Sequence, residues 1–307
     1  MTITSDHLNL EAAHFIGKSL HEKVEWVRKD HFVYYPKARD CLDQLNWILE
    51  QASSSQEEDF PSDLEGMSII GESGAGKTAI VHELIRQHSC KHHISHEEFP
   101  VAYCMLKDSC TGLKGLYTAL FAAYGHPYAD PESLKVERVT VDQLEEVLIH
   151  TLKKVKTRLL FIDEFQHAKG KNQQPLLNQL KRTMIISRVP FVPVGTPEVE
   201  MVLNLDAQLA DRCPVKEFST LHYWSFDEGF RKFLAGYEQF LPFPEPSGLG
   251  DKSTALAIFE KVQLSGGPNG GMTNLRHVVR FLKKVATRAL FNKHDAILDA
   301  DIHTTSY

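Results

Sequence analysis

The stretch Gly71-Glu72-Ser73-Gly74-Ala75-Gly76-Lys77-Thr78 decides the fold of this chain. It matches G-x-x-x-x-G-K-[ST], follows a predicted strand and opens a predicted helix, which is the setting that distinguishes a phosphate-binding loop from an ordinary glycine-rich turn. The glycines let backbone N–H groups curl around phosphate oxygens, Lys77 adds a positive charge, and the Thr78 hydroxyl reaches Mg²⁺. The stretch therefore predicts a nucleoside triphosphate site that uses Mg²⁺.

Around this loop, short apolar runs alternate with helical segments from residue 66 to residue 220. We predict strands at 67–70, 101–106, 158–162 and 189–194, with a weaker one near 215–218. We predict helices between them at 78–88, 113–124, 141–154 and 175–186. Strands that alternate with helices imply parallel pairing, so the fold class is α/β with a three-layer core.

The flanking regions are predicted to be helical. Helix-type spacing covers residues 8–33 and 38–51, and the polar, acidic stretch 53–63 indicates a linker. Beyond residue 221 we predict helices at 223–240, 254–264 and 274–291, the last with Thr273 as its N-cap. The expected division is an N-terminal helical extension and linker at 1–62, a nucleotide-binding core at 63–220 and a small helical lid domain at 221–307.

Composition indicates an ordinary globular protein, with 42% hydrophobic and 24% charged residues. The sequence contains no apolar run of the ~18–20 residues that a membrane span needs, and residues 1–15 do not resemble a signal peptide. The five cysteines are widely spaced without a C-x-x-C pair, which is typical of reduced thiols. These features predict a cytoplasmic protein with no membrane contact.

The net charge of −6 excludes a protein coated with basic residues for DNA binding. If DNA is a partner, its contacts must come from a local stripe or from an assembled oligomer.

A second motif is the apolar run Leu159–Ile162, which ends in Asp163 and Glu164. An acid at the end of such a strand holds Mg²⁺ in P-loop NTPases, and we assign this role to Asp163. Glu164, one residue further on, is placed to polarise the attacking water as a general base. The alternative is an acidic strand end exposed to solvent, which the upstream phosphate loop disfavours.

Three further residues fit the pattern of AAA+ ATPases, namely Thr196, Arg212 and Arg276. Thr196 follows the strand at 189–194, where these proteins carry a small polar residue called sensor 1; it could instead be a turn residue. Because Pro193 lacks an N–H, we expect this strand to end early or to bulge there. Arg212, in the run 206–212, fits an arginine finger that reaches the γ-phosphate of a neighbouring subunit, with a surface pair to Asp211 as the alternative.

Arg276, at the start of the last predicted helix, is the candidate for the arginine called sensor 2. Arg280 or His277 could hold that role instead, or Arg276 could be a helix-surface arginine. A separate group of histidines, at 88, 92, 93 and 96, lacks the cysteine or carboxylate support of a zinc site, so we expect solvated loop residues.

Taken together, the motifs resemble the TniB/TnsC family of AAA+ transposition regulators, including those of CRISPR-associated transposons. The resemblance is carried by YPKA at 35–38, the phosphate loop, LLFIDEFQHA at 159–168, LLNQLKR at 176–182, VPVGTPEVE at 192–200 and DAQLADRC at 206–213. One difference is Gly74-Ala75-Gly76, where mercury-type regulators often read GNGKT. Phosphate binding is unaffected by this difference, but the subfamily is left open.

The resemblance implies an ATP-dependent homo-oligomer, a ring or a helical filament, that binds double-stranded DNA. It also implies partners, namely a transposase and a TniQ-like targeting protein, with ATP hydrolysis driving disassembly. By motif position, the family's DNA contacts fall on Lys114 and Thr140, with Lys107 as a neighbouring candidate; each could instead be a surface lysine or a helix N-cap. Residues 1–33 are expected to be a docking surface for a protein partner.

Three other classes of ATPase compete with this interpretation. A helicase- or initiator-loader ATPase would need a C-terminal DNA-reading domain, for which the residues after 221 leave no room. A signalling NTPase switch would carry sensor repeats or an effector domain, and we find neither. A small-molecule P-loop kinase would not need the lid or an arginine at position 212.

Overall fold

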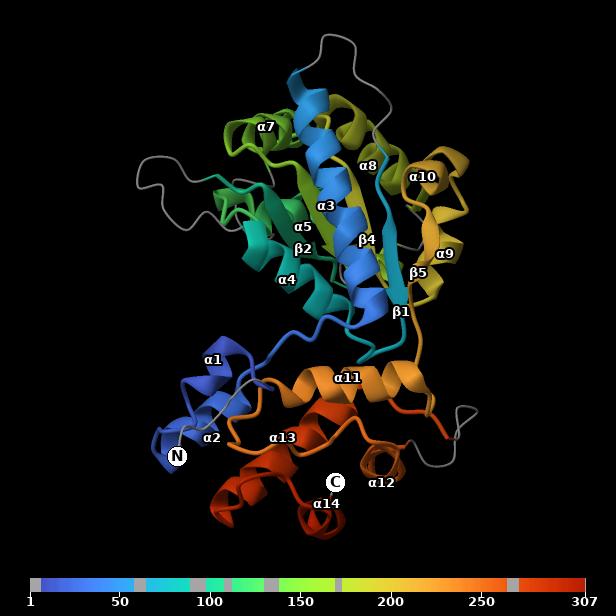
Figure 1. Ribbon diagram of the computed structural model, residues 1–307. Helices are drawn as coiled ribbons and strands as arrows, with labels where there is room; N and C mark the ends of the chain where they lie inside the picture. The colour runs from blue at the N-terminus through green and yellow to red at the C-terminus, as the bar shows by residue number, and fades with distance from the viewer. Residues whose placement is uncertain are drawn as a thin grey trace. The chain divides into compact units, whose positions relative to one another are not determined.

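The computed structural model describes residues 7–57, 65–88, 98–107, 112–129, 138–168, 173–263 and 271–306 (Figure 1). The chain divides into two compact units, which we call the helical unit and the sheet unit. The helical unit comprises Met1–Arg39, Ser73–Gly76 and His222–Tyr307. The sheet unit comprises Asp40–Glu72 and Lys77–Leu221. The domain boundaries predicted at 62 and 220 stay predictions.

In the sheet unit, the described residues form a five-stranded parallel sheet in the order β2-β3-β4-β1-β5. The strands are β1 (Ser68–Gly71), β2 (Val101–Met105), β3 (Leu159–Asp163), β4 (Phe191–Gly195) and β5 (Val215–Leu221). All five coincide with predicted strands to within a few residues. Because β4 lies between β1 and β3, its end is flanked by the end of β1, which leads into the phosphate loop, and by the end of β3, which carries the acid pair.

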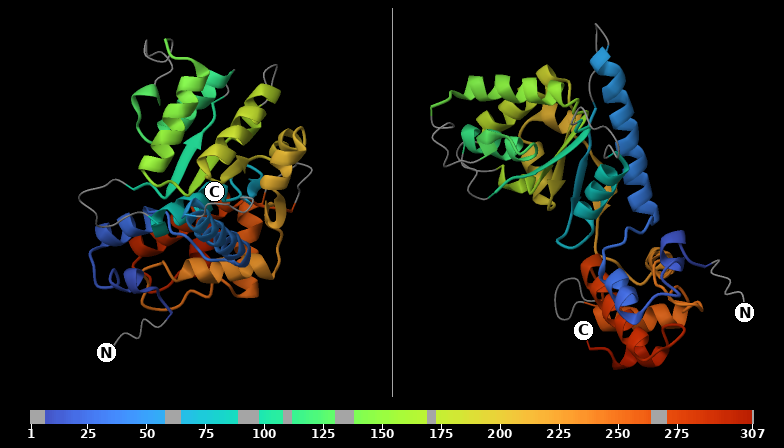
Figure 2. Two further views of the ribbon diagram at one scale, coloured as in Figure 1. Left: turned by 90° about the horizontal axis from the view of Figure 1, so that it is seen from above. Right: turned by 90° about the vertical axis from the view of Figure 1, so that its left-hand side faces the viewer.

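Helices cover both faces of this sheet. They are α3 (Pro36–Glu57), α4 (Lys77–His88), α5 (Leu113–Ala122), α7 (Val141–Lys154), α8 (Gln173–Ser187), α9 (Glu198–Leu203) and α10 (Ala207–Arg212), with short 3₁₀ turns η1 (Pro127–Ala129) and η2 (Phe165–His167). Figure 2 shows α3 and α4 on one face, and α7 and α8 on the other. The predicted three-layer α/β architecture is therefore present.

Helix α3 is longer than predicted. Its buried face holds the predicted residues Leu42, Leu45, Ile48 and Leu49. The helix continues to Glu57, so the prediction of a linker is wrong for residues 53–57, and residues 58–63 lie outside the described part of the chain. At this end the Ser53 hydroxyl donates to the Leu49 carbonyl at 2.9 Å and accepts from Arg158 at 2.7 Å, which lets a polar residue continue the helix.

The expectation that Pro193 ends β4 or makes it bulge is also wrong. The strand runs to Gly195, and Pro193 pairs in register with Ile162 of β3. The pairing of β4 with β1 starts at Val194, the residue after the proline. The missing N–H therefore falls just before that second ladder begins, where it costs the sheet little.

The helical unit is built from α1 (Leu10–Ala13), α2 (Leu20–Arg28), α11 (Glu228–Glu238), α12 (Lys252–Val262), α13 (Leu275–Phe291) and α14 (Asp299–Thr304). Asn274 caps α13 by accepting from the His277 N–H at 2.8 Å, so the N-cap predicted at Thr273 is wrong. Thr273 is buried and instead donates to the Val262 carbonyl at 2.7 Å. Helices α9, α10 and α14 were not predicted, because each spans a single short run of six residues.

Aromatic side chains hold the N-terminal residues within the helical unit. Trp26 stacks on Phe15 with ring centroids 4.6 Å apart, and its indole N–H donates to the Phe240 carbonyl at 2.7 Å. The His31 ring stacks on Phe240 with ring centroids 5.1 Å apart, and it packs at a tilt against Trp26 at 4.5 Å. Burial lowers the pKa of His31, so the ring stays neutral near pH 7 and stacks as an uncharged aromatic group. None of the described helices is long and apolar enough to cross a membrane.

Candidate nucleotide-binding site

The phosphate loop leads directly from β1 into α4. Gly74 and Gly76 have φ angles of +80° and +103°, a conformation that glycine adopts without the steric cost of a Cβ. Helix α4 begins at Lys77, whose ammonium donates to the carbonyls of Gly71 at 2.7 Å and Glu72 at 3.1 Å. The ammonium of Lys77, which the sequence assigned to phosphate binding, is therefore held by two carbonyls at the start of the phosphate loop.

Asp163, the last residue of β3, is buried and surrounded by hydrogen-bond donors. Its Oδ2 accepts from the Tyr103 hydroxyl at 2.8 Å and lies 3.5 Å from the Thr78 Oγ1, while Oδ1 accepts from the Glu164 N–H at 2.8 Å. Burial, and then the hydrogen bond to Asp163, raise the pKa of Tyr103, which stays a donor at neutral pH. Thr78 and Asp163 thus bring together two oxygen ligands of the kind that Mg²⁺ prefers.

Glu164 marks the point where the chain turns out of the sheet. Its φ of 54° and ψ of 37° are left-handed, which directs the chain from β3 into the turn η2. Its side chain is 42% exposed and accepts a hydrogen bond from the Gln166 amide nitrogen. The His167 Nε2 lies 3.7 Å from the same carboxylate oxygen, beyond hydrogen-bond distance.

Thr196 follows β4 and faces the same end of the sheet. Its N–H donates to the Gln166 Oε1 at 3.2 Å. Its hydroxyl oxygen is buried and has no hydrogen-bond partner among the described residues. A buried hydroxyl without a partner is costly, so this atom is suited to meet a ligand or a water molecule in the site.

In the helical unit, loop residues 73–76 pack against the start of α13. The Arg276 N–H donates to the Gly74 carbonyl at 3.1 Å, and its side chain is exposed. A Cβ added at Gly74 would lie 3.2 Å from Arg276 and Asn274. His277 is half-buried, and burial, followed by the charges of Arg280 and Arg276, lowers its pKa. The Arg276 backbone therefore lies next to the phosphate loop, and Arg280 lies one helical turn further along α13.

Arg212 is the last residue of α10 and is half-buried. Asp206 begins this helix by accepting the Leu209 N–H at 3.0 Å, and it pairs with Lys181 at 2.7 Å. Burial raises the pKa of Asp206, but the hydrogen bonds from Lys181 and Leu209 outweigh it, so the pKa lies below the usual value. The short helix that presents Arg212 is thus fixed at its start by a buried charge pair.

Comparison with known proteins places this geometry in a family. The family model described as Bacterial TniB protein matches residues 23–224. The chain belongs to the TniB family. No curated protein matches this TniB chain.

Solved structures with a similar fold include ORC proteins of Aeropyrum pernix and Drosophila. The ADPNP–ADP form of the Aeropyrum pernix ORC2 protein has a TM-score of 0.62 at 17% identity, covering 91% of the TniB chain and 70% of that chain. The Aeropyrum pernix ORC1 protein in complex with DNA has a TM-score of 0.50 at 14% identity, with 92% and 68% covered. The Drosophila ORC bound to DNA has a TM-score of 0.51 at 14% identity, with 94% and 65% covered. The TniB chain therefore has the AAA+ P-loop NTPase fold, and at these identities the likeness concerns the fold alone.

The three candidate DNA contacts of this TniB protein share one end of the sheet unit. Lys107 is exposed just after β2, Lys114 is the second residue of α5, and Thr140 caps α7 by accepting the Gln143 N–H at 3.3 Å. The far ends of α5 and α7 meet at the start of the strands, where the Tyr124 and Thr157 hydroxyls are 3.2 Å apart. Since both helices run toward that end, their starts lie with Lys107 at the carboxyl ends of the strands.

The other sequence candidates have simpler surroundings. His88 is the last residue of α4 and is half-buried, 2.6 Å from the Asn46 Oδ1, and burial lowers its pKa, so the expectation of a solvated loop residue is wrong for His88. His92, His93 and His96 lie outside the described residues. Sequence reasoning missed Tyr103, Gln166 and His167 as neighbours of the acid pair. Gln166 and His167 belong to the family run IDEFQH, which indicated their presence but not their contacts, and Tyr103 carried no signal in its strand.

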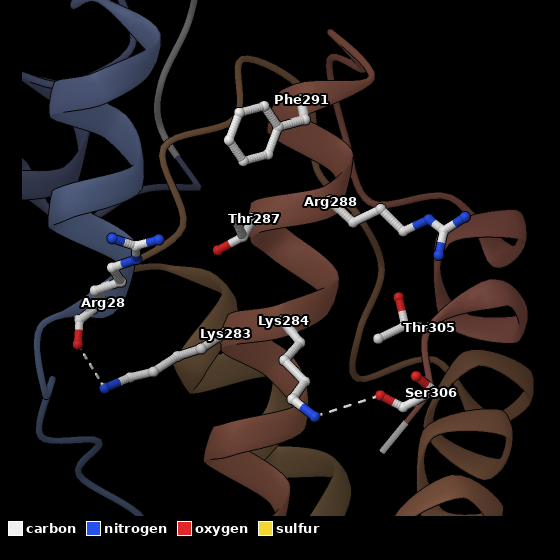
Figure 3. A pocket seen from close by; sticks show the side chains of 8 residues that line it. All are labelled: Arg28, Lys283, Lys284, Thr287, Arg288, Phe291, Thr305 and Ser306. Atoms are coloured by element: carbon white, nitrogen blue, oxygen red, sulfur yellow. Dashed lines mark hydrogen bonds between the residues drawn. The ribbon is translucent and has the colours of Figure 1, made fainter.

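A separate basic cavity of about 630 Å³ lies in the helical unit (Figure 3). Lys283 donates to the Arg28 carbonyl at 2.8 Å and Arg288 to the Thr304 carbonyl at 2.7 Å, which holds these cations in place. No carboxylate lines the cavity among the described residues. Its lining residues are Arg28, Lys283, Lys284, Thr287, Arg288, Phe291, Thr305 and Ser306.

Proposed function

We propose that this TniB-family protein is an ATP-dependent regulator of transposition that oligomerises on double-stranded DNA and hydrolyses ATP. The observation that carries the proposal is the convergence of Thr78, Asp163, Glu164 and Thr196 in the sheet unit. Metal ligands, a general base and an unpartnered hydroxyl are the groups that triphosphate hydrolysis needs.

Each group takes a defined role in this proposal. Lys77 exchanges its two loop carbonyls for phosphate oxygens when ATP binds. The Thr78 hydroxyl and the Asp163 carboxylate would hold Mg²⁺, which would neutralise phosphate charge. Glu164 accepts a proton from the attacking water, and the Thr196 hydroxyl helps to orient that water or the γ-phosphate.

Oligomerisation completes the site. Arg212 of a neighbouring copy reaches the γ-phosphate, and Arg276 senses the nucleotide in its own chain. Removing an arginine finger costs ~10³–10⁵ in rate in other NTPases. We therefore expect Arg212→Ala to retain ATP binding by the monomer and to lose hydrolysis by the oligomer. Equal hydrolysis by both proteins would remove Arg212 from this role.

DNA binding follows from assembly. A chain of net charge −6 with contacts only at Lys107, Lys114 and Thr140 binds DNA weakly as a monomer. Repetition of those contacts along a ring or filament multiplies the affinity. Two proteins of similar fold, the Aeropyrum pernix ORC1 protein and the Drosophila ORC, are described in complexes with DNA, which supports this proposal.

The test is negative-stain imaging of the protein with duplex DNA, with and without a non-hydrolysable ATP analogue. Ordered assemblies are expected only with the analogue, and Lys77→Ala should prevent them because it abolishes nucleotide binding. Glu164→Gln should bind ATP without turnover and retain the assemblies. DNA binding by the nucleotide-free monomer as tight as that of the ATP-loaded form would refute the assembly model.

Protein partners, which we propose to be a transposase and a TniQ-like targeting protein, dock on the helical unit. The basic cavity supports this, because Arg28 from α2 and Lys284 from α13 both line it and give it positive charge. We expect Arg28→Glu with Lys284→Glu to weaken partner binding at unchanged ATPase rate. The matched control is Lys232→Glu on α11, a lysine outside the cavity. Equal effects of both changes would argue against docking there.

A further inference from the structure

Gln166 connects the two groups that face the reacting end of the site. Its amide nitrogen donates to the Glu164 Oε2, and its Oε1 accepts the Thr196 N–H at 3.2 Å. Glu164 belongs to the turn after β3 and Thr196 to the turn after β4, so one carboxamide bridges two strand ends. Both polar ends of the side chain are used, and the residue is only 6% exposed.

The chain makes room for this bridge at one residue. A Cβ added at Gly195 would lie 2.1 Å from the Gln166 Oε1 and 2.7 Å from Val199. The φ angle of Gly195 is not positive, so glycine is needed here because a Cβ has no room, and not because of the backbone conformation. The close approach of Gln166 to β4 therefore requires a glycine at this position.

The bridge leaves the reactive atoms available. A carboxylate has two oxygens, and Gln166 occupies Oε2 of Glu164, so Oε1 can accept a hydrogen bond from water. The Thr196 hydroxyl is likewise not used by the bridge, since Gln166 contacts the Thr196 backbone. Gln166 thus holds the base and the buried hydroxyl in a fixed relation without occupying either.

We infer that Gln166 is a positioning residue for ATP hydrolysis, which sets the Glu164 carboxylate relative to Thr196 by hydrogen bonds to both. This inference rests on the proposed function of the site. Gln166 acts through Glu164 and does not itself touch the nucleotide. Within the run IDEFQH, Asp163 would bind the metal, Glu164 would activate the water and Gln166 would align Glu164.

The decisive variant is Gln166→Glu, which keeps the size of the side chain and its ability to accept from Thr196. It replaces the donor to Glu164 by a second carboxylate. If the N–H donation matters, Gln166→Glu and Gln166→Ala should each lower kcat about 10- to 100-fold, the cost of a misplaced catalytic group. The Kd for a fluorescent ATP analogue should stay close to that of the wild type in both variants, whereas the Tm of Gln166→Glu should fall because the new carboxylate is buried beside Glu164.

The matched control is Gln179→Glu on α8, which makes the same charge change at a glutamine that donates to the Tyr117 hydroxyl at 2.7 Å. It should hydrolyse ATP like the wild type. Wild-type kcat in Gln166→Glu would overturn the inference, because a role in filling space survives that change. A loss of ATP affinity in step with kcat would overturn it too.

A second measurement separates this inference from the proposed function. In protein labelled with ¹⁵N-glutamine, the Gln166 side-chain amide signal is the one missing from Gln166→Ala. Glu164→Ala should shift that signal and speed its hydrogen exchange, because the acceptor is gone. An unchanged signal refutes the bridge whether or not ATP is hydrolysed, whereas a wild type without ATPase activity refutes the proposed function.

Discussion

Replacing Gly195 by alanine should disturb the alignment of Glu164 and Thr196 from β4, the strand next to β3. The new Cβ would lie 2.1 Å from the Gln166 Oε1 and 2.7 Å from the Val199 Cγ2, both far below van der Waals contact. The Gln166 carboxamide is the end of a flexible side chain and can swing away. Val199 is fully buried and β-branched, so it has little freedom to yield.

The magnitude follows from these two contacts. The swing of Gln166 breaks its hydrogen bonds to Glu164 and Thr196, and the crowding of Val199 is an overpacking defect of about 1–3 kcal/mol. We therefore expect the free energy of unfolding to fall by about that amount and kcat to fall about 10- to 100-fold, as for the loss of Gln166. Nucleotide affinity should be retained, since Lys77 and the loop are untouched.

The assay is a double-mutant cycle in steady-state ATPase kinetics, with urea denaturation in parallel. If Gly195→Ala acts on catalysis through Gln166, the double variant with Gln166→Ala should be no slower than Gln166→Ala alone. The stability defect should persist in the double variant, because Val199 is still crowded. Gly17→Ala is the matched control, as its Cβ would meet nothing within 4 Å and its φ is not positive.

Two outcomes would refute this reasoning. Wild-type kcat in Gly195→Ala would mean that the alignment of Gln166 is irrelevant to turnover. A double variant whose loss of kcat equals the product of the two single losses would mean that Gly195 and Gln166 act independently, and the shared bridge would have no catalytic role.

Three further predictions concern stability and assembly. Trp26→Ala should lower the free energy of unfolding by ~3–5 kcal/mol in urea denaturation, because it removes a buried aromatic stack; Trp47→Ala, 46% exposed, is the control and should cost only ~0.5 kcal/mol. Because the pKa of Asp206 is lowered, its pair with Lys181 stabilises the fold above the unfolded pKa near 3.8 and loses that effect as pH falls below it, so Asp206→Asn should flatten the acid side of a stability–pH curve. Glu164→Gln should show ATP-dependent DNA assemblies that persist for hours in light scattering, and wild-type hydrolysis by this variant would exclude Glu164 as the base.

Because Trp26 belongs to the core of the helical unit, it limits how the proposed docking role of residues 1–33 can be tested. Removing residues 1–33 would also remove the Trp26 stack and its hydrogen bond to the Phe240 carbonyl. Loss of partner binding after such a deletion would therefore report damage to the helical unit as much as loss of a docking surface. Point changes at Arg28 and Lys284 avoid this, because they alter charge at the cavity and leave the aromatic core in place.

The sequence predicted the sheet unit well because its strands are short apolar runs and its motifs have fixed spacing. The runs around Ile70, Phe161 and Val192 are buried on both faces and are therefore continuously apolar, and their short length identifies them as strands. The sequence could not predict that α3 continues past Ser53, since a serine-rich, acidic run resembles a linker unless tertiary contacts such as that with Arg158 are known. Nor could it predict that β4 runs through Pro193 without ending or bulging, because that depends on where the ladder with β1 begins.

The site was predictable residue by residue but not contact by contact. Motif spacing assigns Asp163 and Glu164 their chemistry, yet a hydrogen bond between Gln166 and Thr196 joins positions 30 residues apart and leaves no local pattern. The same holds for the Tyr103 hydroxyl on Asp163, which joins positions 60 residues apart. Such contacts arise from strand order, and β4 must first lie beside β3 before either exists.

The order of the sheet also explains why alignment falls to Gln166. Asp163 ends β3 and pairs with Met105 of β2, so the sheet ladder holds its backbone, whereas Glu164 has already left β3 in a left-handed turn. A side chain carried on a turn is less constrained in position than one carried on a strand, and a general base must be held in one position for catalysis. Gln166, three residues beyond Asp163, reaches back to β4 through the space left by Gly195. Gln166 and Gly195 therefore act together. A change at either residue should displace the Glu164 carboxylate and, with it, the attacking water.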